Sequence, residues 1–380
     1  MGKPEELYVP IPRRTVLKGA AILGGSALLA ACGNGGPPAA TKPRGITVKD
    51  QRGKTLVFDG PVKRVVTVPM PAASILVAVD RTADHLVGMQ TASWTAMRDG
   101  IMGRMFPGTL EIPHDVASQE FAPNVESILA LKPDVVVQWA DQGAGIIAPM
   151  ENAGLTVLGV QYGTQETVNT WLRMFAAMLG KPDHAKEMIS RIDNERKRIE
   201  SAASGRSAKP KILYFNRFAE GLKVAGNRTY NDDYIRLVGA TNPAAGDGGA
   251  PGMGMVGVDV EQVLKWDPDV ILLGNFDAAM PDDIYKDTVW EAVSAVKSRR
   301  VYKAPLGGYR WDPPSQESPL MWKWLSRIAF PSDQNAGLRD DIVSSYALLY
   351  DYKPSDAEMD DILWTGVNKA SANYGQFDAA

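Results

Sequence analysis

The 380-residue chain has one cysteine, Cys32, and only three histidines, at positions 85, 114 and 184. A single cysteine excludes a disulfide within the chain, so the hydrophobic core must hold the fold. The few scattered histidines argue against a bare zinc or manganese ion as cargo, because such sites need several converging histidines and carboxylates. A formal net charge of −3 offers no basic surface for nucleic acid.

Sequence motifs of catalysis are missing as well. There is no Gly-x-Ser-x-Gly elbow, no His-Glu-x-x-His pair and no Gly-x-Gly-x-x-Gly after a strand. The adjacent carboxylates at 232–233 and 282–283 suit solvated helix starts better than acid–base chemistry. We therefore expect that the protein is not an enzyme. The alternative is an enzyme that is exported as a lipoprotein.

The first 31 residues have the order of an export signal. Two arginines and a lysine precede an uncharged run, 19–31, which is too short to span a bilayer about 30 Å thick. The string PRRTVLKG resembles a twin-arginine signal, and LAAC resembles a lipobox in which Cys32 would carry a lipid. We expect an exported protein anchored to the membrane through Cys32, in the periplasm or at the outer face of the cytoplasmic membrane. A chance free thiol is the alternative.

A repeat organises the rest of the chain. Residues 124–137 read NVESILALKPDVVV and residues 259–272 read DVEQVLKWDPDVIL, with six of fourteen positions identical at an offset of 135. Each copy begins with a good helix N-cap, runs about two helical turns, stops at a proline and continues as a short β-branched run. Each copy therefore predicts a helix, a Pro-Asp turn and a buried strand.

The surroundings of the two copies also match, since strands at 64–68 and 211–215 open each half and a helix and another strand follow each copy. The fold class is therefore α/β, with two similar Rossmann-like lobes that have parallel sheets and are joined by one long helix. The expected segments are a signal (1–31), a flexible tether (32–45), an N-terminal lobe (46–163), a helical connector (164–204) broken near 179–182, a C-terminal lobe (205–330) and C-terminal helices packed on a lobe (331–380).

Together these features resemble the substrate-binding lipoproteins of ABC importers that carry ferric siderophores, haem and cobalamin. The resemblance covers about residues 46–352, and its most specific string is V-E-x-[IV]-L-x-x-x-P-D-[VI], at 125–135 and 260–270. The string ESPLMWKWLSRIAFP resembles a late helix of the same proteins. The resemblance implies a monomer with no intrinsic cofactor, whose ligand is a metal chelate of iron or cobalt. A small nickel or other metal complex is the alternative ligand.

The resemblance also implies a partner and a docking surface. In that family the glutamate of each repeat copy docks into arginine pockets of a permease dimer, which works with its ATPase. The corresponding residues here are Glu126 and Glu261. Charged pairs of this kind orient a transient complex. The alternative is that each glutamate only complements the dipole of its own helix.

The ligand is expected beyond the carboxyl ends of the parallel strands. Large or charged residues predicted at those ends are Met70, Trp94, Trp139, Tyr162, Arg217, Tyr309, Arg310 and Trp311. Aromatic faces suit a large planar or catecholate ligand, and arginine can bind an anionic chelate bidentately. A single tryptophan at such a place can equally serve core packing.

Two further segments leave alternatives open. The glycine-rich stretch 246–257 is either a mobile lid that brings Met253 and Met255 to the ligand or a flexible surface loop. His114 is the one loop histidine near the expected cleft, and its possible role is direct coordination of a metal already held in a chelate.

Overall fold

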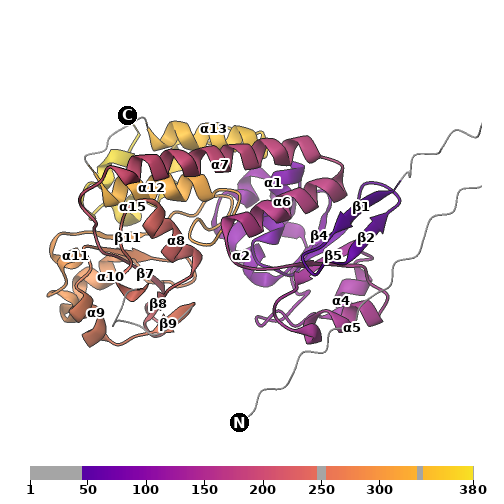
Figure 1. Cartoon of the computed structure of the whole chain (residues 1–380), viewed down its shortest axis with the longest axis horizontal. Helices are drawn as coiled ribbons and strands as arrows, with labels where there is room; N and C mark the ends of the chain where they lie inside the picture. Colours follow the sequence, from indigo (N-terminus) through magenta and orange to yellow (C-terminus); the bar gives the residue numbers. More distant parts are fainter. Residues whose placement is uncertain (1–44, 246–253, 332–336, 380) are drawn as a thin grey trace, which may run out of the picture. The chain divides into compact units, whose positions relative to one another are not determined.

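The structure, a computed structural model, describes residues 45–245, 254–331 and 337–379 (Figure 1). The predicted export signal, Cys32, Met253 and most of the tether lie outside these residues. Within the described ranges, no helix has both the length and the apolar composition that a transbilayer segment needs.

The first half of the fold is built on a four-stranded sheet in which all neighbouring strands are parallel. In spatial order the strands are β4 (Leu86–Met89), β3 (Val65–Thr67), β5 (Val135–Trp139) and β6 (Val157–Val160). Valine fills most buried positions of the inner strands, because β-branched side chains suit a strand covered on both faces. An antiparallel hairpin, β1 (Ile46–Lys49) and β2 (Thr55–Phe58), precedes this sheet.

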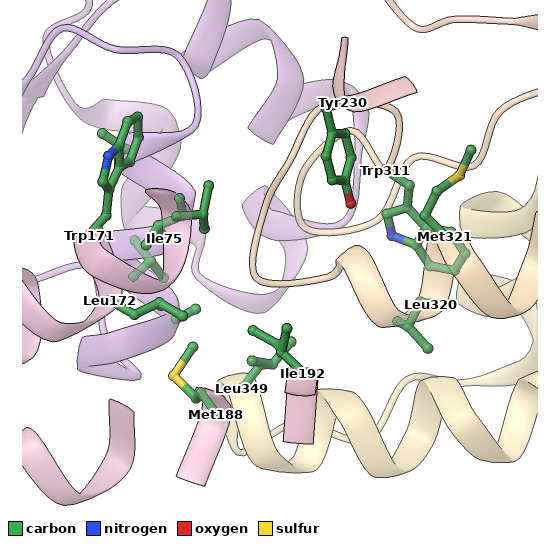
Figure 2. Packing of buried hydrophobic residues seen from close by; sticks show 14 of the residues in the cluster. Ile75, Trp171, Leu172, Met188, Ile192, Tyr230, Trp311, Leu320, Met321 and Leu349 are labelled. Carbon is green, nitrogen blue, oxygen red and sulfur yellow. The ribbon is translucent and has the colours of Figure 1, made fainter. Parts of the chain in front are cut away.

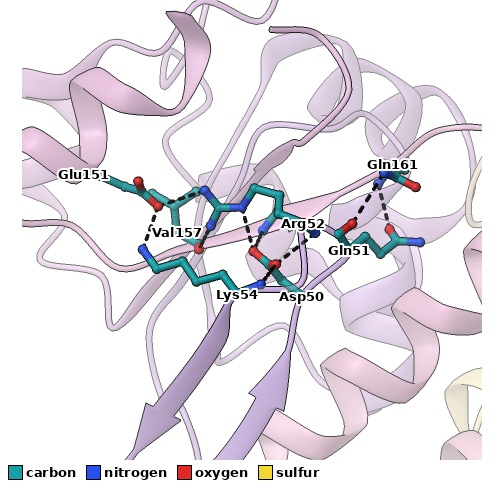
Figure 3. Close-up of polar contacts among 8 residues, drawn as sticks. Asp50, Gln51, Arg52, Lys54, Glu151, Val157 and Gln161 are labelled. Carbon is teal, nitrogen blue, oxygen red and sulfur yellow. Dashed lines mark hydrogen bonds and ion pairs between the residues drawn. The ribbon is translucent and has the colours of Figure 1, made fainter. Parts of the chain in front are cut away.

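Asp50, in the hairpin turn, ties the hairpin to β6 (Figure 3). Its buried carboxylate accepts the backbone N–H groups of Arg52 and Lys54 at 2.9 Å and that of Gly159 at 3.0 Å. The Arg52 guanidinium donates to the same carboxylate at 2.7 Å and to the Val157 carbonyl oxygen at 2.7 Å. The buried charge is thereby surrounded by donors, as a carboxylate removed from water requires.

The second half has a five-stranded sheet that is parallel on one side only. Its order is β11 (Val301–Lys303), β10 (Val270–Leu273), β7 (Ile212–Arg217), β8 (Lys223–Ala225) and β9 (Met255–Gly257). The first three strands are parallel, whereas β8 and β9 add antiparallel pairs. Three strands thus correspond between the halves, β3 with β7, β5 with β10 and β6 with β11. The two-lobed α/β class is confirmed, and the antiparallel edge is an addition to it.

Both copies of the sequence repeat form the elements that the pattern predicts. The helices are α4 (Val125–Ala130) and α9 (Val260–Trp266), and the strands that follow are β5 and β10. The Asn124 side chain caps α4 by accepting the Ser127 N–H at 3.2 Å, and Asp259 caps α9 by accepting the Gln262 N–H at 2.7 Å. These caps satisfy N–H groups that a first helical turn leaves without partners.

The remaining helices cover the sheets and connect the halves. They are α1 (Ala72–Asp80), α2 (Thr91–Asp99), α3 (Met102–Met105), α5 (Ala148–Asn152), α6 (Gln165–Leu179), α7 (Pro182–Ser204), α8 (Tyr230–Leu237), α10 (Pro281–Lys286), α11 (Ser294–Lys297), α12 (Ser318–Ala329), α13 (Leu338–Tyr350), α14 (Asp356–Leu363) and α15 (Thr365–Asn368).

Helix α7 is the long connection between the halves. Gly180 ends α6 in the left-handed conformation (φ 71°), and Pro182 opens α7, so the break falls within 179–182 as predicted. At 1.5 Å per residue its 23 residues extend about 34 Å. It packs against α6, α8 and α12. Its Met188 and Ile192 enter a core with Leu172 of α6 and Leu349 of α13 (Figure 2).

The C-terminal region packs against both halves. Helix α13 contacts α12 in the second half and α1 in the first. Arg81, which follows α1, donates to the Leu348 carbonyl oxygen at 2.8 Å. The halves are therefore joined through α13 as well as through α7.

Candidate ligand-binding site

A pocket of about 550 Å³ lies at the carboxyl ends of strands from both sheets. Residues that end or follow β3, β5 and β6 line it from the first half, and residues of or after β7, β10 and β11 line it from the second. Its aromatic lining consists of Phe121, Trp139, Tyr162, Tyr214, Tyr230, Phe276 and Tyr309. Its position agrees with the general rule that α/β sheets bind ligands at strand ends.

Trp139, the last residue of β5, anchors one aromatic wall. Its ring meets Phe121 edge to face at 5.8 Å and 81°, and it meets Tyr162 at 5.9 Å and 80°. Such edge-to-face pairs are favourable orientations of aromatic quadrupoles. Tyr162 is 47% exposed, so its ring still offers surface to a ligand.

Three buried donor groups on this pocket have no hydrogen-bond partner among the described residues. They are Nη1 of Arg217, the hydroxyl of Tyr309 and Nε1 of Trp139. Burying such a group without a partner costs about 1–3 kcal/mol, and folded proteins keep few of them. Burial raises the pKa of Tyr309, with Arg310 opposing the shift, so its hydroxyl stays a neutral donor. The pocket therefore suits a ligand rich in hydrogen-bond acceptors.

A second arginine, Arg228, also lines the pocket. Its φ of 60° places it in the left-handed region, which costs a side-chain-bearing residue about 1–2 kcal/mol. The next residue, Thr229, caps α8 by accepting the Asp232 N–H at 3.0 Å. The strained turn before α8 thus brings another guanidinium to the pocket, which raises its positive charge.

Among the described residues that line the pocket, Asp312 is the only acidic one, and it is fully buried and held by donors of the fold. Its carboxylate accepts the Tyr214 hydroxyl at 2.6 Å, the Asn275 backbone N–H at 3.1 Å and the Asn275 Nδ2 at 3.0 Å. Burial and the nearby Asp312 raise the pKa of Tyr214 well above its usual value, so it remains protonated and donates. Asp312 therefore fixes the segment after β11, and its charge is turned toward the protein.

The structure brings together four of the seven ligand contacts predicted from the sequence. Trp139, Tyr162, Arg217 and Tyr309 line the pocket, as does Met70 after β3.

Trp94 does not line it. Its ring stacks on His114 at 4.4 Å and 26°, the Arg98 guanidinium lies 4.9 Å from the ring centre, and its Nε1 donates to the Leu110 carbonyl oxygen at 3.0 Å. Trp94 therefore packs within the first half.

Arg310 and Trp311 are also absent from the pocket lining. The Arg310 guanidinium donates to the carbonyl oxygens of Asn275 at 3.1 Å and of Ala92 in α2 at 3.3 Å, so it links the halves. Trp311 is fully buried, and its Nε1 donates to a carboxylate oxygen of Glu317 at 2.6 Å. Adjacent residues of this irregular loop thus face opposite sides, and only Tyr309 reaches the pocket.

Glu317, at the start of α12, fixes the loop from inside. Besides Trp311, its carboxylate accepts the Gly308 N–H at 3.1 Å, the Tyr346 hydroxyl at 3.1 Å and the Tyr350 hydroxyl. Burial raises the pKa of Glu317 to about 7, although these donors oppose the shift. The adjacent Gly307 carbonyl oxygen accepts the N–H of residue 101 at 3.0 Å, which is a second link to the first half.

Sequence reasoning missed most of the side chains that shape the pocket. They include Phe121, Tyr214, Asn216, Arg228, Tyr230, Asn231, Phe276 and Asp312. Phe276 follows β10 and could have been found by applying the strand-end rule to the second repeat. Arg228 could not, because a left-handed turn before α8 brings it to the pocket.

The histidines have other neighbours. His85 Nδ1 lies 2.5 Å from Asp80 Oδ2, and His184 Nε2 lies 3.1 Å from the Ala78 carbonyl oxygen. In the described part of the chain, no three His, Cys, Asp or Glu side chains form a group that could hold a metal ion. Coordination of a chelated metal by His114 stays a prediction.

Glu126 and Glu261 lie in the first turns of α4 and α9, and both are exposed. Neither makes an ion pair or a side-chain hydrogen bond among the residues that the structure describes. The N-caps are supplied by Asn124 and Asp259, so the glutamates are not needed for capping. Their role as docking residues stays a prediction.

Two α/β halves with a pocket at their strand ends, joined by a long helix, define a two-lobed solute-binding protein. Residues 116–306 match the periplasmic binding protein family, and the chain belongs to this family. A periplasmic solute-binding protein of Veillonella parvula is 33% identical and covers 85% of this chain and 98% of its own, with a TM-score of 0.78.

Two curated relatives agree with this family. The molybdate-binding protein MolA of Haemophilus influenzae is 23% identical over 82% of this chain and 93% of its own length. The Fe(3+)-citrate-binding protein YfmC of Bacillus subtilis is 25% identical over 68% of this chain and 77% of its own. MolA is described as the cognate periplasmic binding protein of an ABC transporter. The chain is thus a periplasmic solute-binding protein by family and not an enzyme.

Proposed function

We propose that the protein captures an anionic metal chelate in the 550 Å³ pocket and delivers it to the permease of an ABC importer. The observation that carries this proposal is the set of three unpartnered donors, on Trp139, Arg217 and Tyr309, within an aromatic lining. Carboxylate, catecholate or hydroxamate oxygens of a chelate would accept from these donors, and Arg217 and Arg228 would neutralise its charge.

The size of the pocket favours a chelate over a bare oxyanion. Its volume is within the range of about 300–1,000 Å³ that small-molecule sites occupy. One water takes about 30 Å³ of liquid, so an anion of four oxygens would fill only a small part of it. The aromatic rings add apolar contact that a small hydrated anion cannot use. Iron or cobalt is the expected metal, and a nickel complex is the alternative.

One of the two named relatives matches this choice, since YfmC is named for Fe(3+)-citrate, a chelate. MolA is named for molybdate, a bare oxyanion, and it shares with Fe(3+)-citrate only that the ligand is a metal species rich in oxygen. An acceptor-rich ligand is also what the three buried donors require.

The proposed delivery step uses Glu126 on α4 and Glu261 on α9. Both carboxylates are exposed at equivalent positions of the repeat, so they would meet equivalent basic pockets on two permease subunits. Attachment of a lipid at Cys32 would keep the protein beside that permease. Import that survives the double change Glu126→Ala and Glu261→Ala, with normal ligand binding, would refute this docking.

The ligand is tested on protein purified from its native host. We expect an absorption band in the visible range, with iron or cobalt near one atom per protein by elemental analysis. Nickel would select the alternative ligand, and a purified protein that carries no metal and binds none would refute the chelate.

The pocket is tested by variants purified in the same way and titrated with ferric citrate as the probe. Tyr309→Phe removes one donor and is expected to weaken binding about tenfold, whereas the stability of the fold should not change because the hydroxyl has no internal partner. Arg217→Ala removes a charged donor, and we expect a loss of roughly 10- to 100-fold. Arg98→Ala on the exposed face of α2 is the control. Unchanged metal content and affinity in both pocket variants would show that the ligand binds elsewhere.

A further inference from the structure

The two repeat helices expose a second equivalent pair of residues beside the glutamates. Leu129 on α4 is 43% exposed and Leu264 on α9 is 36% exposed, and these residues are 135 positions apart, as the two repeat copies are. Each leucine follows its glutamate by three residues, so the two side chains share one face of the helix. The described surface exposes few other large apolar residues to this extent.

The fold accounts for the other residues that the two copies share. The valines that open each helix and each strand pack against the hydrophobic cores, and the prolines lie in the turn between helix and strand. Asp134 accepts the backbone N–H groups of Lys63 and Arg64 at 2.8–2.9 Å, and Asp269 accepts that of Lys211 at 2.7 Å. Among the residues that are identical in the two copies, only the glutamate and the leucine are exposed in both copies and make no side-chain contact that the fold requires. Asp134 is also exposed, but its carboxylate is held by backbone N–H groups.

A leucine that stays exposed at the same place in both halves contributes less to folding than a buried leucine would. Burial of apolar surface stabilises the folded state in proportion to the area removed from water, and a leucine that is two-fifths exposed forgoes part of that gain. A single exposed apolar residue needs no explanation, but an equivalent pair beside an equivalent pair of charges forms two matching patches. In Figure 1, α4 and α9 both lie along the lower edge of the described fold, opposite α7 and α13.

We propose that Leu129 and Leu264 are the apolar anchors of the surface that docks on the permease dimer. This inference rests on the docking role proposed for Glu126 and Glu261. Each permease subunit would offer an apolar hollow beside its basic residue. The glutamates attract and orient the partner at long range, whereas the leucines, once desolvated, slow dissociation.

The test measures the affinity of the full-length protein for its own permease and ATPase complex in lipid nanodiscs, by surface plasmon resonance without added ligand. The double variant Leu129→Ala with Leu264→Ala is expected to bind about tenfold more weakly, through faster dissociation and equally at low and high salt. The double variant Glu126→Ala with Glu261→Ala is expected to associate more slowly, with an effect that salt reduces.

The matched control is the double variant Val57→Ala with Val289→Ala. These valines are 67% and 49% exposed and lie outside α4 and α9, and their loss should leave docking unchanged. Unaltered thermal unfolding checks that each variant is folded. If only the glutamate variant loses affinity, the leucine anchors are refuted and the proposed docking stands. If neither double variant changes affinity, both proposals fail. If the valine control weakens docking as much as the leucine variant does, the leucine anchors are also refuted.

Discussion

Glu317 is expected to make the stability of this fold depend on pH. Its carboxyl group is fully buried beneath the loop that carries Tyr309, and burial raises its pKa from 4.5 to about 7. Because the pKa of Glu317 is higher in the folded protein, the folded protein keeps the carboxyl proton between pH 4.5 and about pH 7, whereas the unfolded chain has lost it. The free energy of unfolding contributed by Glu317 is therefore highest below pH 4.5, and it falls as the pH rises through 7.

The size of this effect follows from the shift. One pKa unit corresponds to about 1.4 kcal/mol, so a shift from 4.5 to about 7 changes the free energy of unfolding by about 3 kcal/mol. The matched variant is Glu317→Gln, which cannot titrate. Each carboxylate oxygen faces an obligate donor, the Gly308 N–H on one side and Trp311 Nε1 on the other. An amide has one acceptor oxygen, so in either orientation one donor is left unpaired, at about 1–3 kcal/mol.

The assay is urea unfolding of both proteins at pH 5 and pH 8. We expect the wild type to exceed the variant in stability at pH 5 and this advantage to shrink by about 2–3 kcal/mol at pH 8. Taking the difference between the two proteins cancels the other groups that titrate in this range. An advantage that is equal at both pH values would refute the reasoning, because it would mean that Glu317 does not titrate between them.

Two further substitutions test the packing around the site, each with a control. Asp50→Ala leaves the buried N–H of Gly159 in β6 and two part-buried N–H groups of the hairpin without an acceptor, so urea unfolding should show a loss of about 3 kcal/mol. Asp59→Ala on the exposed surface should have little effect. Equal stability of the two variants would contradict the network in Figure 3. Gly307→Ala would push a methyl group into the Glu317 carboxylate. We expect the free energy of unfolding to fall by about 3 kcal/mol or more, which a lower melting temperature would show. Gly366→Ala meets no neighbouring atom and should melt like the wild type, and a Gly307 variant that does the same would disprove this packing.

The parts of the fold that could be predicted are those in which local sequence and tertiary structure agree. The repeat carries its own caps, turn prolines and β-branched runs, so both copies were placed correctly from 125 to 135 and from 260 to 270. The hairpin at 46–58 was not predicted, although the buried Val48 and Leu56 alternate with exposed residues as a half-covered strand does. Strand β9 has three residues and depends on its pairing with β8, so local propensity gives no sign of it.

The site was harder to predict, because its residues come from turns. The strand-end rule found Trp139 and Arg217, which end regular strands. In the loop after β11, only the folded structure separates Tyr309, which reaches the pocket, from Trp311, which packs beside Glu317. Sequence composition around 307–314 indicates an irregular loop, and an irregular backbone has no period from which the direction of a side chain can be derived.

The two halves are connected by more than one segment, since α7, α13 and the loop that carries Arg310 all reach across. Multiple connections limit how far the halves can swing apart, so the walls of the pocket are largely in place before a ligand arrives. A preformed site loses little conformational entropy on binding, which favours high affinity. The same rigidity makes release the difficult step. Under the proposed delivery to an ABC importer, unloading would need a force that opens the pocket from outside, and ATP hydrolysis by the importer would supply it.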